Sequence, residues 1–474
     1  MRTQYAMRRW ISPLLLLALA AFSCALFLAE PEARGGGPYY ATTASAPGQA
    51  FTWNLASLPG QQIQYTLDSG PMSTTDSGSV VISHANGATL VQQALSAWQN
   101  VPTSIISYNN SGIIQGVSGG DVQSVADFNA ATNSCDAGQQ SPVIFDSDGT
   151  ITSALINDSS VVGFTSICDL DPSGGHILAA EVVINGKVVN GGSSAQVGQD
   201  TFGQVLTQLF GTFSGLDHSQ VNVDVLNETP GQCNAQEVAG LPVMFPMVQC
   251  QARLTSNPPL PALAPDDIAW ISDLYPVVAP APQGKTVTST AYGYISGHVY
   301  FSDGATPAQG VNVIARDASS PAASLANAIS AVSGVFFTGN LGQNVTCTNS
   351  DGAGCNPPSP FGSHDPSLIG TYTIPVPMPM NGNSANFTVS VESINSAFTG
   401  TTGINPLNPP IPMPGVAPAA TTVTVVAGQT VILNITLLNT PSPFDAFENA
   451  VLRLTAPPVI WDDQHARRQA EARG

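Results

Sequence analysis

The residue pattern of the chain changes once, at a Pro-, Ala- and Thr-rich segment that spans 277–291. Before this segment, over 51–276, stretches with helical spacing of apolar residues alternate with stretches typical of strands. After it, over 292–438, period-two strands are separated by turn residues, and the last of them form a predicted hairpin over 422–437. The sequence therefore predicts a mixed domain of helices and strands, a linker, and an all-β sandwich.

Charged side chains are scarce in this chain. They make up 9% of the 474 residues, against about 25% in an average protein, and the formal net charge is −19. Between residues 35 and 452 the basic side chains are Lys187, Arg253, Lys285 and Arg316. So few cations cannot neutralise a run of phosphates, which excludes nucleic acid as a partner. The same deficit excludes an anionic membrane surface.

The N-terminal residues 1–33 have the layout of an export signal. Three arginines precede an apolar stretch over 11–29, and polar and glycine residues follow it. We expect a signal peptide or, without cleavage, a membrane anchor, because about 20 apolar residues span a bilayer. The protein would then be secreted or held in the cell envelope on its extracellular or periplasmic side. A linker over 34–50 and a solvated tail over 439–474 are expected, with membrane contact only through 1–33.

Cysteine usage agrees with export. Apart from Cys24 there are six cysteines, an even number, and disulfides persist outside the cytosol. Nearest neighbours along the chain would give three local bridges, Cys135 to Cys168, Cys233 to Cys250 and Cys347 to Cys355. Six cysteines allow fifteen pairings, so the sequence leaves the connectivity open.

A predicted helix over Thr201–Phe213 is the most informative segment. Its apolar residues recur at helical spacing, and it ends at Ser214-Gly215, because glycine accepts the left-handed backbone that terminates helices. The chain continues as Leu216-Asp217-His218-Ser219. This arrangement resembles the zinc-binding helix and turn of the matrixin branch of the metzincin metallopeptidases, whose pattern is H-E-x-x-H-x-x-G-x-x-H-S.

The turn residues of that motif match, but most of its zinc ligands and its catalytic base do not. Five matching residues set the register: Gly211, Gly215, Leu216, His218 and Ser219. In this register Gln208 replaces the first histidine, Leu209 the catalytic glutamate and Thr212 the second histidine. Three imidazoles would hold zinc and the glutamate would take a proton from the zinc-bound water, whereas a carboxamide and a hydroxyl are weak ligands. We therefore expect no catalytic residue, and no cofactor unless the degenerate site Gln208, Thr212 and His218 retains zinc.

Four further segments resemble the same family in the same order. They are Gln62–Asp68 followed by the helix that contains Trp98, Gly175–Asn185 as the substrate-side edge strand, Leu241–Pro246 as the Met-turn around Met244, and Asp266–Pro276 as the closing helix. The resemblance implies an α/β metzincin-like (matrixin) domain over 51–276.

Structural alternatives stand beside each metal-site interpretation. His218 is either a relic ligand next to Asp217 or Gln208, or a partly buried imidazole hydrogen bonded to the backbone, and Met244 is either a Met-turn residue beneath zinc or plain core packing. Asp146 and Asp148 are spaced like the first carboxylates of a calcium loop. The alternative for this pair is a turn before a strand-like segment, 150–155.

The second domain has a resemblance of its own. Four short segments are similar to the carboxypeptidase-regulatory-like (transthyretin-like) β-sandwich: Ile295–Val299, Asp303-Gly304, Gln309–Ala315 and Gly370–Ile374. Such modules act as spacers or interaction domains and carry no catalytic residues. The loop between Cys347 and Cys355 is either a contact site or a plain stabilising loop.

These observations lead to one functional prediction and two alternatives. The prediction is an exported pseudoprotease that binds a polypeptide or glycan in the former active-site cleft, where a strand such as Ala180–Ile184 could pair with an extended peptide. The first alternative is a zinc-dependent metalloendopeptidase with an altered site. The second is a passive structural protein of the envelope.

Overall fold

The computed structural model describes residues 37–38, 40–41, 49–156, 161–171, 175–192, 197, 199–221, 241–245, 263–308, 310–319, 327–334, 368, 370–393 and 415–439. The described residues belong to one compact unit. The predicted export signal over 1–33 and the part of the predicted tail after Asn439 lie outside the described residues. Among the helices of the described part, none is long and apolar enough to cross a membrane.

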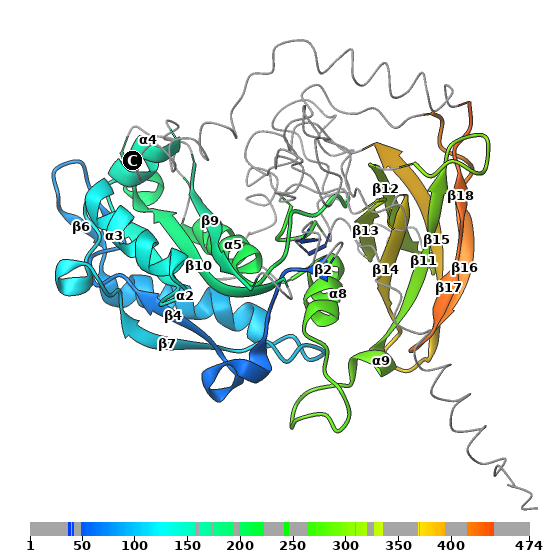
Figure 1. The fold of residues 1–474 in the computed structure, drawn as a ribbon, viewed down its shortest axis with the longest axis horizontal. Helices are drawn as coiled ribbons and strands as arrows, with labels where there is room; N and C mark the ends of the chain where they lie inside the picture. Colours follow the sequence, from blue (N-terminus) through cyan, green and yellow to red (C-terminus); the bar gives the residue numbers. More distant parts are fainter. Residues whose placement is uncertain are drawn as a thin grey trace, which may run out of the picture. The chain divides into compact units, whose positions relative to one another are not determined.

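The first half of the unit is built on a mixed sheet (Figure 1). Its strands lie in the order β7 (Tyr108–Ile113), β4 (Ile63–Leu67), β8 (Pro142–Asp146), β10 (His176–Asn185) and β9 (Gly163–Leu170). The strands β7, β4, β8 and β10 are parallel to one another, and β9 is antiparallel to β10. A short strand, β3 (Thr52–Trp53), pairs with the beginning of β10.

The edge strand of this sheet is not the one that the sequence indicates. Gly175–Asn185 was predicted to be the edge, but β10 lies between β8 and β9 and is an interior strand. The reason is visible in its composition, because strands covered on both faces have near-continuous apolar sequences, and β10 is almost entirely buried. The edge is β9, whose side chains are all half-buried.

Helices cover both faces of the sheet. The helices α2 (His84–Gln99) and α5 (Gln199–Phe213) pack in one core with alternate residues of β8 and β10. On the opposite face, α3 (Val125–Asp136) and α4 (Thr150–Ile156) cover Ile144 and Val183. The two cores follow from the period-two alternation of side chains along the strands.

The strand-like segment 150–155 is a helix, so that prediction was wrong. Both carboxylate oxygens of Asp146 accept backbone hydrogen bonds from the first turn of α4, at distances of 3.1 Å from Ile151 N and 2.7 Å from Thr152 N. Such capping satisfies the amides that a helix leaves unpaired at its start. A short apolar segment alone does not distinguish a strand from a helix of this length.

The second half is a β-sandwich of two sheets. One sheet has the order β14 (Thr371–Pro377), β11 (Tyr292–Tyr300) and β17 (Thr430–Ile432), with β18 (Ile435–Thr436) also on β11. The other has the order β13 (Ala328–Val332), β12 (Val311–Asp317), β15 (Ser384–Ser393) and β16 (Thr421–Val426). The predicted hairpin over 422–437 is wrong, because β16 pairs with β15 in one sheet and β17 with β11 in the other.

The segment predicted as a linker is hydrogen bonded to the first half. Lys285 Nζ donates to the carbonyl oxygens of Gln99 and Val101, at 2.7 and 2.8 Å, where α2 ends. Val277 N donates to Thr288 Oγ1, in the short helix α9 (Thr288–Ala291). The remaining short elements are β1 (Tyr40–Ala41), β2 (Gln49–Ala50), η1 (Leu55–Ser57), η2 (Pro59–Gln61), β5 (Ser73–Thr74), β6 (Val80–Ile82), η3 (Ser118–Gly120), η4 (Gly186–Val189) and, between the two halves, α8 (Pro265–Leu274).

Candidate functional site

The helix α5, which contains the segment that resembles the zinc-binding motif, lies in the core. Its apolar face is fully buried, and Trp98 of α2 donates its indole N–H to the carbonyl of Thr207 at 2.8 Å. The helix stops at Gly215, whose φ of +95° is a conformation that glycine adopts without strain. A Cβ atom there would lie 2.3 Å from the carbonyl oxygen of Phe51. The chain therefore turns at Gly215, the residue that the resemblance aligns with the glycine of the zinc-binding turn.

The predicted Met-turn lies against α5. A Cβ atom on Gly211 would come within 2.3 Å of Met244 Sδ and 2.7 Å of the Trp98 ring. Phe245 N donates to Pro242 O at 3.0 Å, which closes the turn. Met244 is 2% exposed and packs against Gly211 of α5, a contact that either interpretation of this residue would give.

Asp267 of α8 fixes this turn. Its carboxylate accepts hydrogen bonds from Val243 N at 2.8 Å, Met244 N at 3.0 Å and Ala264 N at 2.8 Å. Burial raises the pKa of Asp267 to about 6, and the three backbone hydrogen bonds oppose that shift. The sequence places Asp267 in the closing helix without showing this role, although two acids in the first turn of a helix are a signal for capping.

His218 lies in the turn that follows α5, next to Met244. Ser219 N donates to Met244 O at 3.0 Å. The His218 backbone amide donates to Asp217 Oδ1 at 2.7 Å, and His218 Nδ1 lies 3.7 Å from the same oxygen. Nδ1 is buried and has no hydrogen-bond partner among the described residues. The expectation that the backbone satisfies this imidazole is therefore not met at Nδ1.

The other motif positions carry neutral, nearly buried side chains. Gln208 Nε2 donates to Phe245 O at 3.2 Å, so the carboxamide binds the Met-turn. Thr212, one helical turn later, is 8% exposed. Leu209 packs beside Gly163 of β9, and its carbonyl accepts a hydrogen bond from Thr165 Oγ1 at 3.0 Å. The position that the resemblance aligns with the catalytic glutamate is thus an apolar contact between α5 and β9.

A zinc ion does not fit this set of residues. The site offers one imidazole, one carboxamide whose N–H already donates to a carbonyl, and one hydroxyl, whereas structural and catalytic zinc sites use three or four histidine, cysteine or carboxylate ligands. Within the described part of the chain, no three His, Cys, Asp or Glu side chains are grouped so that they could hold a metal ion. The chemistry open to the site is hydrogen bonding and apolar contact.

The calcium candidates act as helix caps. Both oxygens of Asp146 accept amides of α4, and Asp148 Oδ1 accepts the amide of Thr150 at 2.9 Å. Burial raises the pKa of Asp146, which disfavours the charged form that calcium binding requires. These contacts favour the structural alternative for this pair.

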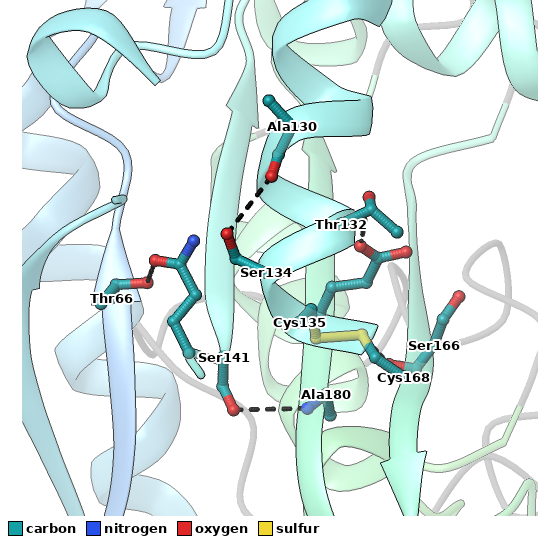
Figure 2. Close-up of a disulfide and its surroundings, with 11 residues drawn as sticks. Thr66, Ala130, Thr132, Ser134, Cys135, Ser141, Ser166, Cys168 and Ala180 are labelled. Atoms are coloured by element: carbon teal, nitrogen blue, oxygen red, sulfur yellow. Dashed lines mark hydrogen bonds between the residues drawn. A yellow bond between two sulfur atoms is a disulfide. The ribbon is translucent and has the colours of Figure 1, made fainter. Parts of the chain in front are cut away.

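A disulfide attaches the edge strand to α3. Cys135 of α3 and Cys168 of β9 are bonded, with their Cα atoms 5.6 Å apart (Figure 2). This confirms the first of the three predicted bridges. Beside it, Thr132 Oγ1 donates to Glu181 Oε2 of β10 at 2.8 Å. The other four candidates, Cys233, Cys250, Cys347 and Cys355, lie outside the described residues.

The strand β9, which lies beside α5 and pairs with β10, is not predicted by the sequence. Its side chains mix polar and apolar types without a clear period, so no strand signal stands out. The one sequence signal was Cys168, whose predicted bridge to Cys135 places this segment beside α3. Compared with known proteins, the chain matches no protein-family model, no curated protein and no solved structure.

Proposed function

We propose that the chain is an exported, non-catalytic protein with a metallopeptidase-like scaffold that binds an extended polypeptide along β9. The observation that carries the proposal is the position of β9. It is the antiparallel edge strand of the sheet, and it lies directly beside the motif helix α5.

The edge of β9 favours a polypeptide over a glycan. One side of β9 pairs with β10 from Gly163 to Leu170, and within the described residues no strand pairs with its other side. A sheet edge offers a row of backbone donors and acceptors that an extended peptide can match. A glycan has no such repeating backbone pattern.

Neutral chemistry at the site supports binding without cleavage. Leu209 occupies the position of the base, and a leucine side chain cannot accept a proton from water. Thr165 and Gly163 face the same helix and carry no charge, so the first part of β9 is uncharged on the side of α5. The expected ligand is an extended segment with small or apolar side chains toward α5.

The disulfide between Cys135 and Cys168 supports export of the protein, and it also supports an ordered β9 strand. Structural disulfides persist in oxidising compartments. Because Cys168 belongs to β9, its bond to α3 limits the freedom of the edge strand. A preordered edge loses less conformational entropy when a peptide adds to it.

The test is a hydrogen-exchange footprint. Binders would be selected from a displayed library of random unstructured decapeptides, and exchange of the full chain would be measured with and without them. We expect new protection over Gly163–Leu170, and none over β7, which is the opposite edge of the same sheet and serves as the internal control.

Three outcomes would overturn the proposal. Binders that protect only other surfaces would exclude β9 as the site. An absence of saturable binders would favour a passive envelope protein. Cleavage of the decapeptides that stops with a zinc chelator would favour a metalloendopeptidase.

A further inference from the structure

The segment that follows His218 is held by the β-sandwich. Gln220 N donates to Ser330 Oγ at 3.3 Å, and Gln220 O accepts from Asn312 Nδ2 at 3.1 Å. Ser330 lies on β13 and Asn312 on β12, so one sandwich sheet uses both backbone groups of a single residue. All three residues are buried.

Ser330 binds α8 at the same point. Its backbone N–H donates to Asp266 Oδ1 at 2.9 Å, and its carbonyl accepts the indole N–H of Trp270 at 3.1 Å. Asp266 also forms a side-chain hydrogen bond with Ser219. One residue of the sandwich therefore connects the closing helix to the turn that contains His218.

An apolar contact completes this junction. Val221 forms a separate buried cluster with Ile314 of β12 and Ala328 of β13. The chain from Ser219 to Val221 is thus enclosed by hydrogen bonds and by apolar side chains of the same sheet.

Two further sets of hydrogen bonds connect this junction to the Met-turn. Ser219 N donates to Met244 O, and Asp267, which follows Asp266, accepts the amides of Val243 and Met244. The sandwich contacts Gln220 and Asp266 directly, and it reaches the Met-turn through Ser219 and through Asp267, the residue after Asp266.

We propose that the β-sandwich is a built-in clamp that holds the turn Asp217–Val221 and the Met244 turn in place. A zinc ion cannot do this here, because the motif positions offer a single imidazole. The two halves would then be parts of one functional unit. The clamp is independent of the polypeptide proposed above, because it is defined by contacts within the chain.

The experiment uses the full-length protein and measures hydrogen exchange of three segments. Asn312→Ala removes the hydrogen bond to Gln220 O, and Trp270→Phe removes the hydrogen bond to Ser330 O while it keeps an aromatic ring. We expect each variant to speed exchange about tenfold over Asp217–Val221 and Leu241–Phe245, since the loss of one buried hydrogen bond has an effect of about that size. Exchange of α2 should stay as in the wild type.

A matched control lies in the same sandwich. Asn386→Ala removes an exposed hydrogen bond to Thr424 Oγ1, which has no link to the site, and should leave all three segments unchanged. Treatment of the wild type with a chelator should also leave them unchanged. The proposal is overturned if the two clamp variants exchange as the wild type does, if α2 speeds up equally, or if the chelator alone loosens both turns.

Discussion

Gly211 of α5 lies so close to Met244 that a single added carbon would reach 2.3 Å from the methionine sulfur. The same carbon would come within 2.7 Å of the Trp98 ring, which is fully buried. Overpacking a filled core costs about 1 to 3 kcal/mol. We therefore expect Gly211→Ala to lower the free energy of unfolding by that amount, as measured by urea denaturation.

Gly382→Ala is the matched control for this prediction. A Cβ atom at Gly382 would meet Pro379 at 3.5 Å, an ordinary contact distance, and the backbone there needs no positive φ. Its free energy of unfolding should stay within about 0.5 kcal/mol of the wild type, as for most surface substitutions. Equal stability of the two variants would contradict the close packing of Met244 on α5.

Local sequence patterns predict single helices, but they do not predict contacts between residues that are distant in the sequence. The helix α5 was predicted because Phe202, Leu206, Phe210 and Phe213 repeat at helical spacing and are followed by a glycine, and both signals belong to the segment itself. The clamp residue Ser330 could not be found in this way. A serine in a strand has no special pattern, and its importance comes from partners that are distant in the sequence.

Strand partners show the same limit. The turn Ala427-Gly428-Gln429 has the residues of a hairpin loop, and Gly428 indeed has a φ of +67°. The two strands that it joins nevertheless belong to different sheets, since β16 pairs with β15 and β17 pairs with β11. Period and turn chemistry show that strands exist, whereas pairing depends on burial against the rest of the chain.

Removal of the described disulfide should destabilise the chain and loosen its edge strand. A loop closed over 33 residues corresponds to about 3 to 4 kcal/mol in the chain-entropy treatment. We expect a double variant, Cys135→Ser with Cys168→Ser, to unfold at lower urea concentration. Hydrogen exchange over Gly163–Leu170 should rise, while β7 at the opposite edge stays as it was. If exchange of β9 is unchanged in the folded variant, the disulfide does not order this strand.

Stability should fall as the pH rises from about 4 to 7. Burial raises the pKa of Asp68 to about 7 and that of Asp267 to about 6. The unfolded chain releases these protons near pH 4, whereas the folded chain keeps them up to pH 6 or 7. The unfolded state therefore binds fewer protons in this window, and the free energy of unfolding decreases with pH. Thermal melting at pH 5 and pH 8 should show the higher melting temperature at pH 5.

Asp68→Asn separates this effect from general charge repulsion. Asp68 accepts amides of Gly70, Val122 and Phe145, so the variant is expected to be less stable overall but to show a flatter pH dependence. Asp76→Asn, at an exposed position, should keep the wild-type slope. A steep slope in Asp68→Asn would assign the pH dependence to other groups.

Placing the residues of the metzincin pattern at positions 208, 209 and 212 should create a zinc site. Histidines at positions 208 and 212 lie four residues apart and so share one face of α5, and the observed contact of Gln208 with Phe245 O places that face toward the Met-turn. We expect the triple variant Gln208→His, Leu209→Glu and Thr212→His to bind one zinc ion per chain together with His218. Native mass spectrometry would measure the stoichiometry, and zinc at 100 times its dissociation constant should stabilise the fold by about 2.7 kcal/mol.

A displaced pair of histidines tests the register of this site. Gln204→His with Gln208→His keeps the four-residue spacing but moves it one turn away from His218, so it should bind zinc more weakly and without the third imidazole. His218→Ala should then be added to both variants. It should lower the zinc affinity of the triple variant and leave the zinc affinity of the displaced pair unchanged. Equal zinc affinity of the triple variant and the displaced pair would show that α5 does not have the assigned register. Equal zinc affinity of the triple variant with and without His218→Ala would show that His218 is not a ligand.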